Sequence, residues 1–405
     1  MDVKNNADND NSTDTDIEEL ILEEIEPEEL DEDELSATSN TDSSDNISKP
    51  GLSKQKKKRR FPIWGRILTA IALIIILITA GWNILINVGK ANLYAKSRDA
   101  VPQLPKELMD SDTDVTDVGW EEGWVRYNGK IYRYNQDILT FLVLGIDKDE
   151  RVSDNTSGLD GGQSDGNFLV VLNPDDESVH VICINRDCMT DIDTYDYFGN
   201  YDTTTKAQLE LAHAYGTSKE QNMQNSVKAV SNLFYGIPVH GCVAINMAGI
   251  TSLNDAIGGV KVESLSTFST DGFDYYEGQE AILQGEAAYH YIHYRDEDEF
   301  NSNDDRMSRQ RQYLNAFVAQ AKTAIKKNPS LIANLYTKLT PYMTTDISID
   351  EASYIGSTAL GYNFSDDAIS SIEGETVQGT YYEEFYPDEE ALYRLIVEVF
   401  YEEVK

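Results

Sequence analysis

Hydrophobic positions gather in one long run and in several short ones. The long run, residues 67–89, contains no charged side chain. At about 1.5 Å per residue, a helix of this length crosses a hydrocarbon core of about 30 Å, and Trp64 and Trp82 suit its two interfaces. A buried helix of a soluble domain would normally alternate with polar positions, and a signal peptide would lie nearer the start of the chain. The run therefore predicts a single transmembrane helix.

Short apolar runs after this span predict a layered domain. Residues 138–146, 167–173 and 179–185 are continuously apolar, as expected for central strands that helices cover on both faces. The turn sequence NPDDES predicts that the last two are antiparallel. Strand-like runs at 241–245 and 260–264 alternate with helical periods, which favours an α/β fold with a three-layer α/β/α domain and a mixed central sheet. The predicted helices are 221–235, 246–257, 279–292, 304–327, 349–361 and 387–403.

A hairpin signal precedes the layered domain. Apolar and polar residues alternate around Asn128 and Gly129, a dipeptide that favours a tight hairpin turn. The segment between the span and this hairpin is polar and contains two prolines, which suits a linker. The predicted organisation is a disordered acidic tail (1–53), a basic juxtamembrane segment (54–66), the transmembrane helix (67–89), a stalk (90–117), an accessory hairpin (118–137) and the large domain (138–405).

Charge is distributed unevenly along the chain. Residues 1–50 hold 18 acidic and 2 basic side chains with little to bury, so we expect a disordered tail. Seven basic residues from Lys54 to Arg66 precede the span. Because such residues stay on the cytoplasmic side, we expect a single-pass protein of the cell membrane with a cytoplasmic N-terminus and an extracellular C-terminal domain. From residue 67 onward, 53 acidic side chains outnumber 24 basic ones, an excess that repels nucleic acid.

The cysteines indicate buried thiols rather than a metal site. Cys183, Cys188 and Cys242 lack the spacing of zinc ligands. Cys183 and Cys242 lie in apolar, strand-like runs, so we expect both to be buried. The odd number leaves at least one thiol free.

Charged residues end the predicted central strands. Asp147 follows the first strand, Asp165 immediately precedes the second, and Arg186 and Asp187 follow the third. Ligands of open α/β sheets gather where strands end, although each residue taken alone is more typical of a surface turn. Two carboxylates that converge without a basic neighbour suit a hard divalent cation such as Mg²⁺, which keeps several waters and prefers phosphate as a further ligand.

Arginines supply the complementary chemistry. Arg186, Arg295, Arg306 and Arg309 offer forked donors that bind phosphoryl oxygens. Arg306 stands at the head of the apolar stripe of the predicted helix 304–327, where its guanidinium can extend into a polar pocket near the helix N-terminus. The alternative is an ordinary helix start in which these arginines pair with neighbouring acids. Spacing alone leaves both interpretations open.

A set of short segments resembles one known family. In order, FLVLGID, QSDGNFLVVLNP, VHVICINRD, AHAYG, LQGEAAYHYIHYR and RMSRQRQ resemble the LytR-CpsA-Psr family of cell-wall enzymes over roughly residues 138–325. The predicted tail, span and external domain also match that family's topology. The resemblance implies a Mg²⁺-dependent phosphotransferase that moves a glycopolymer from a polyprenyl-pyrophosphate carrier to peptidoglycan through a phosphodiester link. It also implies that apolar helix positions line a groove for the prenyl chain.

The resemblance assigns roles to particular positions. It implies that Asp147 and Asp165 hold Mg²⁺, and that Asp187 is either a base for the sugar hydroxyl or a partner that orients Arg186. The residues that it places around the pyrophosphate are Arg186, Arg295, Arg306, Arg309 and Gln310.

Three positions depart from the family pattern. Gln163 and His293, both expected beside the substrate, stand where the family usually has arginine, and Asn303 stands where an acid is frequent. Two fixed positive charges are therefore absent or conditional. The alternative function is a catalytically weak or inactive membrane-anchored binding or regulatory protein of the cell envelope. Retention of both Asp147 and Asp165 favours the enzyme, because a binder without chemistry has less use for a metal pair.

Overall fold

In the computed structural model, the folded unit begins at Ile63. The predicted acidic tail and residues 54–62 of the predicted basic segment lie outside the described residues. The described residues are 63–96, 101–108, 120–153, 161–196, 198–296, 299–300, 302–328, 330–365 and 368–404.

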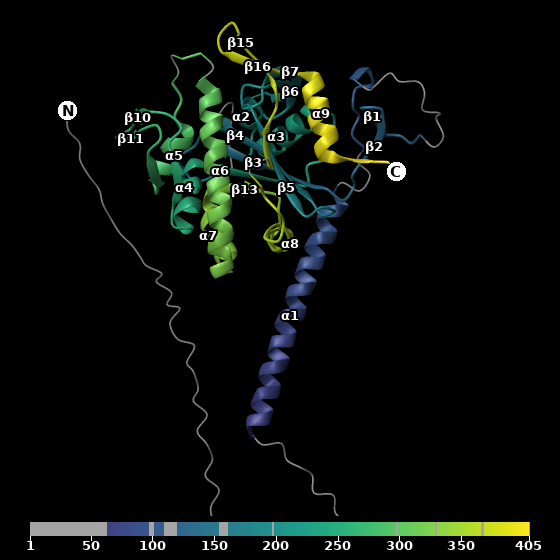
Figure 1. Cartoon of the computed structure of the whole chain (residues 1–405), viewed down its shortest axis with the longest axis vertical. Helices are drawn as coiled ribbons and strands as arrows, with labels where there is room; N and C mark the ends of the chain where they lie inside the picture. Colours follow the sequence, from purple (N-terminus) through teal and green to yellow (C-terminus); the bar gives the residue numbers. More distant parts are fainter. Residues whose placement is uncertain are drawn as a thin grey trace, which may run out of the picture. The chain divides into compact units, whose positions relative to one another are not determined.

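A mixed sheet of six strands forms the centre of the unit (Figure 1). Its strands are β3 (Leu139–Ile146), β4 (Ser164–Asn173), β5 (Ser178–Ile184), β8 (Gly241–Asn246), β13 (Met343–Thr345) and β14 (Ile369–Ser371). The order is β13-β8-β3-β4-β5-β14, in which β3 runs parallel to β8, and β5 runs parallel to β14. The three predicted central strands are confirmed, and β4 and β5 are antiparallel as their turn sequence predicts.

Five of the six predicted helices occur within a few residues of their expected bounds. The exception is 279–292, whose first part is strand β12 and whose remainder is helix α5. Gly285 separates the two at φ 55°, a left-handed conformation that favours glycine. The helices are α1 (Ile63–Ala95), α2 (Leu211–Ala214), α3 (Lys219–Leu233), α4 (Met247–Ala256), α5 (Glu286–His293), α6 (Ser302–Lys327), α7 (Leu331–Leu339), α8 (Ile349–Ala359), α9 (Glu389–Phe400) and the short 3-10 turns η1 (Lys106–Leu108) and η2 (Thr340–Tyr342).

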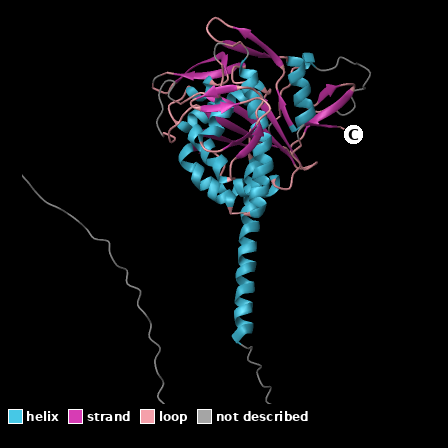
Figure 2. Ribbon diagram, turned by 60° about the vertical axis from the view of Figure 1, so that its left-hand side comes forward, coloured by secondary structure: helices cyan, strands magenta, loops and turns pink. Residues whose placement is uncertain are grey.

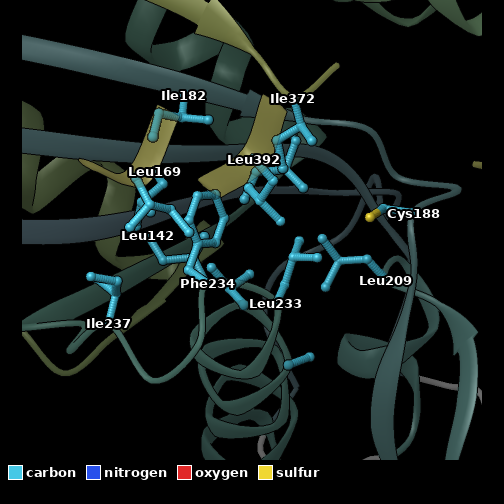
Figure 3. Close-up of a cluster of buried hydrophobic side chains, with 14 of the residues drawn as sticks. Leu142, Leu169, Ile182, Cys188, Leu209, Leu233, Phe234, Ile237, Ile372 and Leu392 are labelled. Atoms are coloured by element: carbon cyan, nitrogen blue, oxygen red, sulfur yellow. The ribbon is translucent and has the colours of Figure 1, made fainter. Parts of the chain in front are cut away.

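Helices cover both faces of the sheet, as the predicted three layers require. Alternate residues of β3 point to opposite faces. Leu142 packs with Phe234, at the end of α3, and with Leu392 of α9 on one face (Figure 3). Phe141 packs with Tyr354 of α8 on the other. The cysteines Cys183, Cys188 and Cys242 are buried and free, which confirms the expectation for the thiols.

Smaller sheets complete the unit. The predicted hairpin is confirmed as β1 (Val125–Tyr127) and β2 (Lys130–Tyr134), with Asn128 and Gly129 at φ 50° and 70°. The last strand, β17 (Tyr401–Glu403), pairs with β2, so this hairpin is joined to the C-terminal segment. The other pairs are β6 (Met189–Tyr195) with β7 (Tyr201–Gln208), β9 (Val260–Glu263) with β12 (Glu280–Leu283), β10 (Phe268–Thr270) with β11 (Phe273–Tyr275), and β15 (Gly374–Gln378) with β16 (Glu383–Pro387).

Helix α1 is longer than the predicted span. Within it, Ile71–Ala95 is long and apolar enough to cross a membrane. The helix projects from the rest of the unit, as Figure 2 shows. Its last turns contact the unit instead of solvent, because Leu93 is fully buried in a cluster with Ile347 and Tyr354.

Candidate active site at the strand ends

Two carboxylates converge where β3 ends and β4 begins. Asp147 follows β3, and its backbone N–H donates to the carbonyl of Gln163 at 2.9 Å. Asp165 lies inside β4 rather than before it, which corrects the sequence-based expectation. The register between β3 and β4 shifts after Gly145, so Asp165 is the extra residue of a β-bulge. A bulge changes the direction of a side chain relative to the regular alternation of a strand between the two faces of its sheet. This bulge brings the Asp165 carboxylate toward Asp147.

His293, the last residue of α5, bridges the two carboxylates. Its Nε2 lies 3.2 Å from Oδ2 of Asp165 and 3.9 Å from Oδ1 of Asp147. Its ring stacks on Tyr289 with centroids 4.8 Å apart, and its Nδ1 lies 3.0 Å from the Tyr289 hydroxyl. His293 therefore contacts both carboxylates.

Two arginines from other elements also reach Asp165. Nη1 of Arg186 forms an ion pair with Oδ1 of Asp165, and Nη1 of Arg306 lies 3.5 Å from Oδ2. Burial alone would raise the pKa of Asp165, but the hydrogen bond from His293 and the two guanidinium charges hold that pKa well below its usual range. Burial and the neighbouring Asp165 raise the pKa of Asp147. Asp165 is therefore the firmly ionised member of the pair.

Asn303 explains how a buried arginine begins the apolar stripe of α6. Arg306 is 2% exposed, and its Nη2 and Nε donate to Oδ1 of Asn303 at 2.7 and 3.2 Å. Nδ2 of Asn303 donates to Oδ1 of Asn185 at 2.6 Å and to Oδ2 of Asp187 at 3.0 Å. An aspartate at position 303 could not donate this hydrogen bond to Asp187. Burial lowers the pKa of Arg306 to about 10, so it stays charged at neutral pH.

Two further carboxylates surround Arg186. Its Nε lies 3.0 Å from Oε2 of Glu210 and 3.6 Å from Oδ1 of Asp187. Burial raises the pKa of Glu210 to about 7 and also raises that of Asp187. Asp187 is 2% exposed and accepts from Asn303, so its enclosure suits the orienting role rather than that of a base. Sequence reasoning missed Glu210, whose only signal is a lone charge in an apolar run.

Arg295 and Gln310 lie at the border of this site. Nε of Arg295 donates to Oγ of Ser302 at 3.0 Å, and its Nη2 pairs with Glu383 of β16. Nε2 of Gln310 donates to the carbonyl of Ile292 at 3.2 Å. Arg295 is thus tied to a strand 88 residues away, a contact that spacing along the chain does not reveal.

Arg309 does not reach the site, contrary to expectation. Its Nε donates to the carbonyl of Tyr291 at 2.9 Å, and Nη2 donates to that of Tyr294. Its guanidinium lies over the ring of Phe268, 4.7 Å from the centroid. Two of its guanidinium nitrogens are thus engaged in linking α6 to the end of α5.

The donor set fits a divalent cation. Asp147, Asp165 and His293 each offer a ligand atom, and these atoms lie within 4.8 Å of one another. The side chain of Asp147 is 51% exposed, which leaves room for water ligands. Among the described residues of the site, the carboxylates outnumber the guanidinium groups. A bound cation would offset this excess negative charge, which would otherwise repel a pyrophosphate. The carboxylates are those of Asp147, Asp165, Asp187, Glu210 and Glu383, and the guanidinium groups are those of Arg186, Arg295 and Arg306.

An apolar cavity of about 240 Å³ adjoins the charged groups. Asp165, His293 and Gln310 line its polar end. Residues of the α6 stripe and of α4 line the cavity. Part of the apolar stripe that the sequence pattern assigns to a core therefore faces this cavity. The apolar lining includes Val143, Phe168, Ile250, Leu253, Leu314 and Phe317.

Comparisons with known proteins place this arrangement in a family. The sequence pattern of the LytR_cpsA_psr family matches residues 109–396. The chain belongs to the LytR-CpsA-Psr family. A relative from Enterococcus faecalis, named polyisoprenyl-teichoic acid–peptidoglycan teichoic acid transferase TagU, is 30% identical over 246 residues, which cover 61% of this chain and 72% of that protein.

Solved structures agree with the fold of this LytR-CpsA-Psr chain. A protein from Streptococcus agalactiae superposes with a TM-score of 0.53 at 20% identity, covering 65% of this chain and 86% of the other. TagV from B. subtilis superposes with a TM-score of 0.50 at 23% identity, covering 65% and 96%. The α/β architecture is therefore shared with other solved proteins.

Proposed function

We propose that this LytR-CpsA-Psr protein is a membrane-anchored phosphotransferase that moves a glycopolymer from a polyprenyl-pyrophosphate carrier to peptidoglycan. One observation carries the proposal: the charged groups border directly on the apolar cavity. Asp165 and His293 belong to the possible metal-binding group and also line the cavity, together with Gln310. A polyprenyl pyrophosphate is an anion joined to an apolar chain, so it matches both parts of the site. The transferase name of the E. faecalis relative supports the same substrate class.

The arginines bind and stabilise the pyrophosphate. Arg186 and Arg306 are held by Glu210 and Asn303 before any substrate arrives. During transfer, an acceptor hydroxyl of peptidoglycan loses its proton to solvent and forms a bond to the phosphorus that carries the glycan, and the bond to the bridging oxygen breaks, so polyprenyl phosphate leaves. Negative charge grows on this leaving phosphate, and fixed positive charges nearby stabilise it. The arginines thereby favour the transition state over the bound carrier.

A magnesium ion completes the proposed site. Asp147 and Asp165 would hold it, and when bound it supplies positive charge that polarises phosphoryl oxygens. His293 donates to Asp165 and fixes its orientation. Asp187 is enclosed by Asn303 and orients Arg186.

Helix α1 anchors the enzyme where its substrates meet. We infer that the basic residues before the span keep the N-terminus in the cytoplasm and that the domain lies outside. This orientation brings the site to peptidoglycan, while the carrier's prenyl chain stays in the same membrane. The apolar run of α1 is long enough for this role.

A binding or regulatory protein without turnover is the second candidate. Gln163 and His293 supply no fixed charge where the family usually has arginine, and Asp165 already pairs with Arg186 and Arg306. Fewer donors therefore remain for the phosphate. If each lost contact removes about 2 kcal/mol of transition-state stabilisation, the rate falls more than a hundredfold.

A transfer assay separates the two candidates. Full-length protein in lipid nanodiscs receives a labelled polyprenyl-pyrophosphate glycan, peptidoglycan and Mg²⁺. We expect a phosphodiester-linked product that Asp165→Ala and Arg306→Ala abolish. Arg394→Ala, which removes an exposed arginine paired with Glu373, is the matched control and should retain activity.

The departures from the family pattern receive their own test in the same assay. Gln163→Arg and His293→Arg should raise the transfer rate if those positions limit an enzyme. Bound lipid without turnover, in the parent chain and in both variants, would instead establish a binding protein.

A further inference from the structure

One stretch of this acidic chain lacks acidic residues altogether. Between Asp305 and Asp346 the sequence contains no Asp or Glu, although 71 of the 405 residues are acidic. The stretch begins with Arg306 of the site. From residue 322 onward it carries four lysines, which are Lys322, Lys326, Lys327 and Lys338.

These lysines lie at one end of the unit, on the last turns of α6 and on α7. Lys326, Lys327 and Lys338 are exposed. Nζ of Lys322 donates to the carbonyl of Tyr362 at 2.7 Å, just beyond α8, and a Cβ on Gly356 of α8 would lie 3.4 Å from Ile332 of α7. The lysine-bearing segments and α8 therefore form one continuous face.

Helix α1 leaves the unit beside that same face. A Cβ on Gly89 would lie 2.1 Å from the carbonyl oxygen of Asp350, so the backbones of α1 and α8 are in close contact. Nδ2 of Asn92 donates to Oδ2 of Asp350 at 3.0 Å. Nζ of Lys96 lies 3.1 Å from Oε1 of Glu351, whose side chain is 4% exposed. α1 is thus docked on α8, and the lower ends of α6 and α7 lie on the side from which α1 projects (Figure 1).

The length of α1 sets where the lipid headgroups begin. The uncharged run 67–88 spans about 33 Å at about 1.5 Å per residue, close to the hydrocarbon thickness of about 30 Å. From Ile71 onward, the first buried residue of α1 is Gly89, at the contact with α8. The headgroup layer on this side therefore begins next to the start of α8, where Ile349 is 61% exposed.

We propose that the face formed by the end of α6, by α7 and by the start of α8 lies against anionic phospholipid headgroups. The inference rests on the membrane anchoring proposed above. The lysines attract anionic headgroups, whereas the rest of the acidic domain is repelled by them, so the domain rests on the membrane through this one face. α7 carries apolar residues beside its lysine, as helices at membrane interfaces do.

This contact fixes the height and the tilt of the catalytic domain. The apolar cavity then keeps a constant position relative to the bilayer from which the prenyl chain enters. A flexible tether would give no such constancy. The same lysines could also attract an anionic glycopolymer, but the docking of α1 places the face at the headgroups, which favours the membrane.

Fluorescence quenching tests this contact on the full-length protein. The native cysteines are buried, so an exposed engineered cysteine can be labelled selectively. Asn334→Cys places a fluorophore on α7, one turn before Lys338, and Asp202→Cys places a reference label on β7, at the end away from α8 (Figure 1). The protein is inserted into nanodiscs of phosphatidylcholine or of phosphatidylglycerol, each containing a lipid with a nitroxide quencher on its headgroup.

We expect strong quenching at position 334 in phosphatidylglycerol and little at position 202. The triple substitution Lys326→Gln, Lys327→Gln and Lys338→Gln should weaken the contact about a hundredfold at low salt, from about fivefold per lysine. The matched control, in which the exposed Lys130, Lys206 and Lys261 become glutamine, should leave the quenching unchanged.

Three results would overturn the inference. Equal quenching at positions 334 and 202 would show no oriented contact, and quenching that survives the triple substitution and high salt would show that the lysines do not hold the face. Shielding of position 334 only after soluble poly(glycerol phosphate) is added would assign the face to the glycopolymer. Because the assay needs no turnover, quenching with a failed transfer assay would keep this contact and remove the proposed enzymatic function.

Discussion

Replacing Glu210 with glutamine tests the electrostatics around Arg186. Glu210 is 5% exposed, and its Oε2 lies 3.0 Å from Nε of Arg186. Burial raises its pKa from 4.5 to about 7, despite the nearby guanidinium. Glutamine keeps the shape of the side chain and removes its titration, so the substitution isolates the effect of this one charge.

The raised pKa determines the sign and size of the effect. An acid with a higher pKa in the folded state binds its proton more tightly there, so folding stability falls as pH rises. The fall begins near the unfolded pKa of 4.5 and is complete above the folded pKa of about 7. At about 1.4 kcal/mol per pKa unit, the total is about 3 kcal/mol. We expect Glu210→Gln to match the parent at the acidic limit and to exceed it by up to about 3 kcal/mol above neutrality.

Thermal unfolding of the full-length protein in detergent measures this difference. Tryptophan fluorescence is followed from about pH 4.5 to about pH 8, and the Tm of Glu210→Gln should rise above that of the parent by roughly 4 °C at the upper end. Glu277→Gln, at an exposed position, is the matched control and should follow the parent throughout. A Tm difference that stays constant with pH would refute the assigned role of Glu210.

Three other changes test the site. Asn303→Leu leaves the charges of Arg306 and Asp187 buried without their shared partner, so urea unfolding should show a loss of about 3–5 kcal/mol. Leu253→Trp fills the apolar cavity, so calorimetry should show weaker binding of polyprenyl pyrophosphate but unchanged binding of inorganic pyrophosphate; equal weakening of both would contradict the cavity's role. Chelation should abolish transfer and added Mg²⁺ should restore it, while Asp147→Asn should raise the Mg²⁺ concentration that gives half activity; full activity in the chelator would exclude a metal requirement.

The sequence predicted the features that depend on local pattern. Continuous apolar runs are typical of strands covered on both faces, so the central strands and their charged ends were predictable. Asn128 and Gly129 indicated the hairpin turn because few other residues adopt positive φ. The pattern therefore places acidic and basic residues near one another at the strand ends.

Features that depend on distant contacts were not predictable in the same way. The bulge at Asp165 arises from the pairing of β3 with β4, and the residue itself has no special type. Glu210 and Glu383 reach their arginines through the fold, so neither has a spacing signal. Arg309 follows Arg306 by three residues, only about 60° round α6. Only the packing of α5 against α6 shows which of these two guanidinium groups faces the site.

A structure with polyprenyl pyrophosphate and Mg²⁺ bound is the most direct measurement of the central claim. The account predicts that the pyrophosphate contacts Arg186 and Arg306, with the metal between it and the carboxylates of Asp147 and Asp165. The prenyl chain should lie in the apolar cavity between α4 and α6. Density for the pyrophosphate away from these four side chains, or for the prenyl chain outside that cavity, would contradict the account.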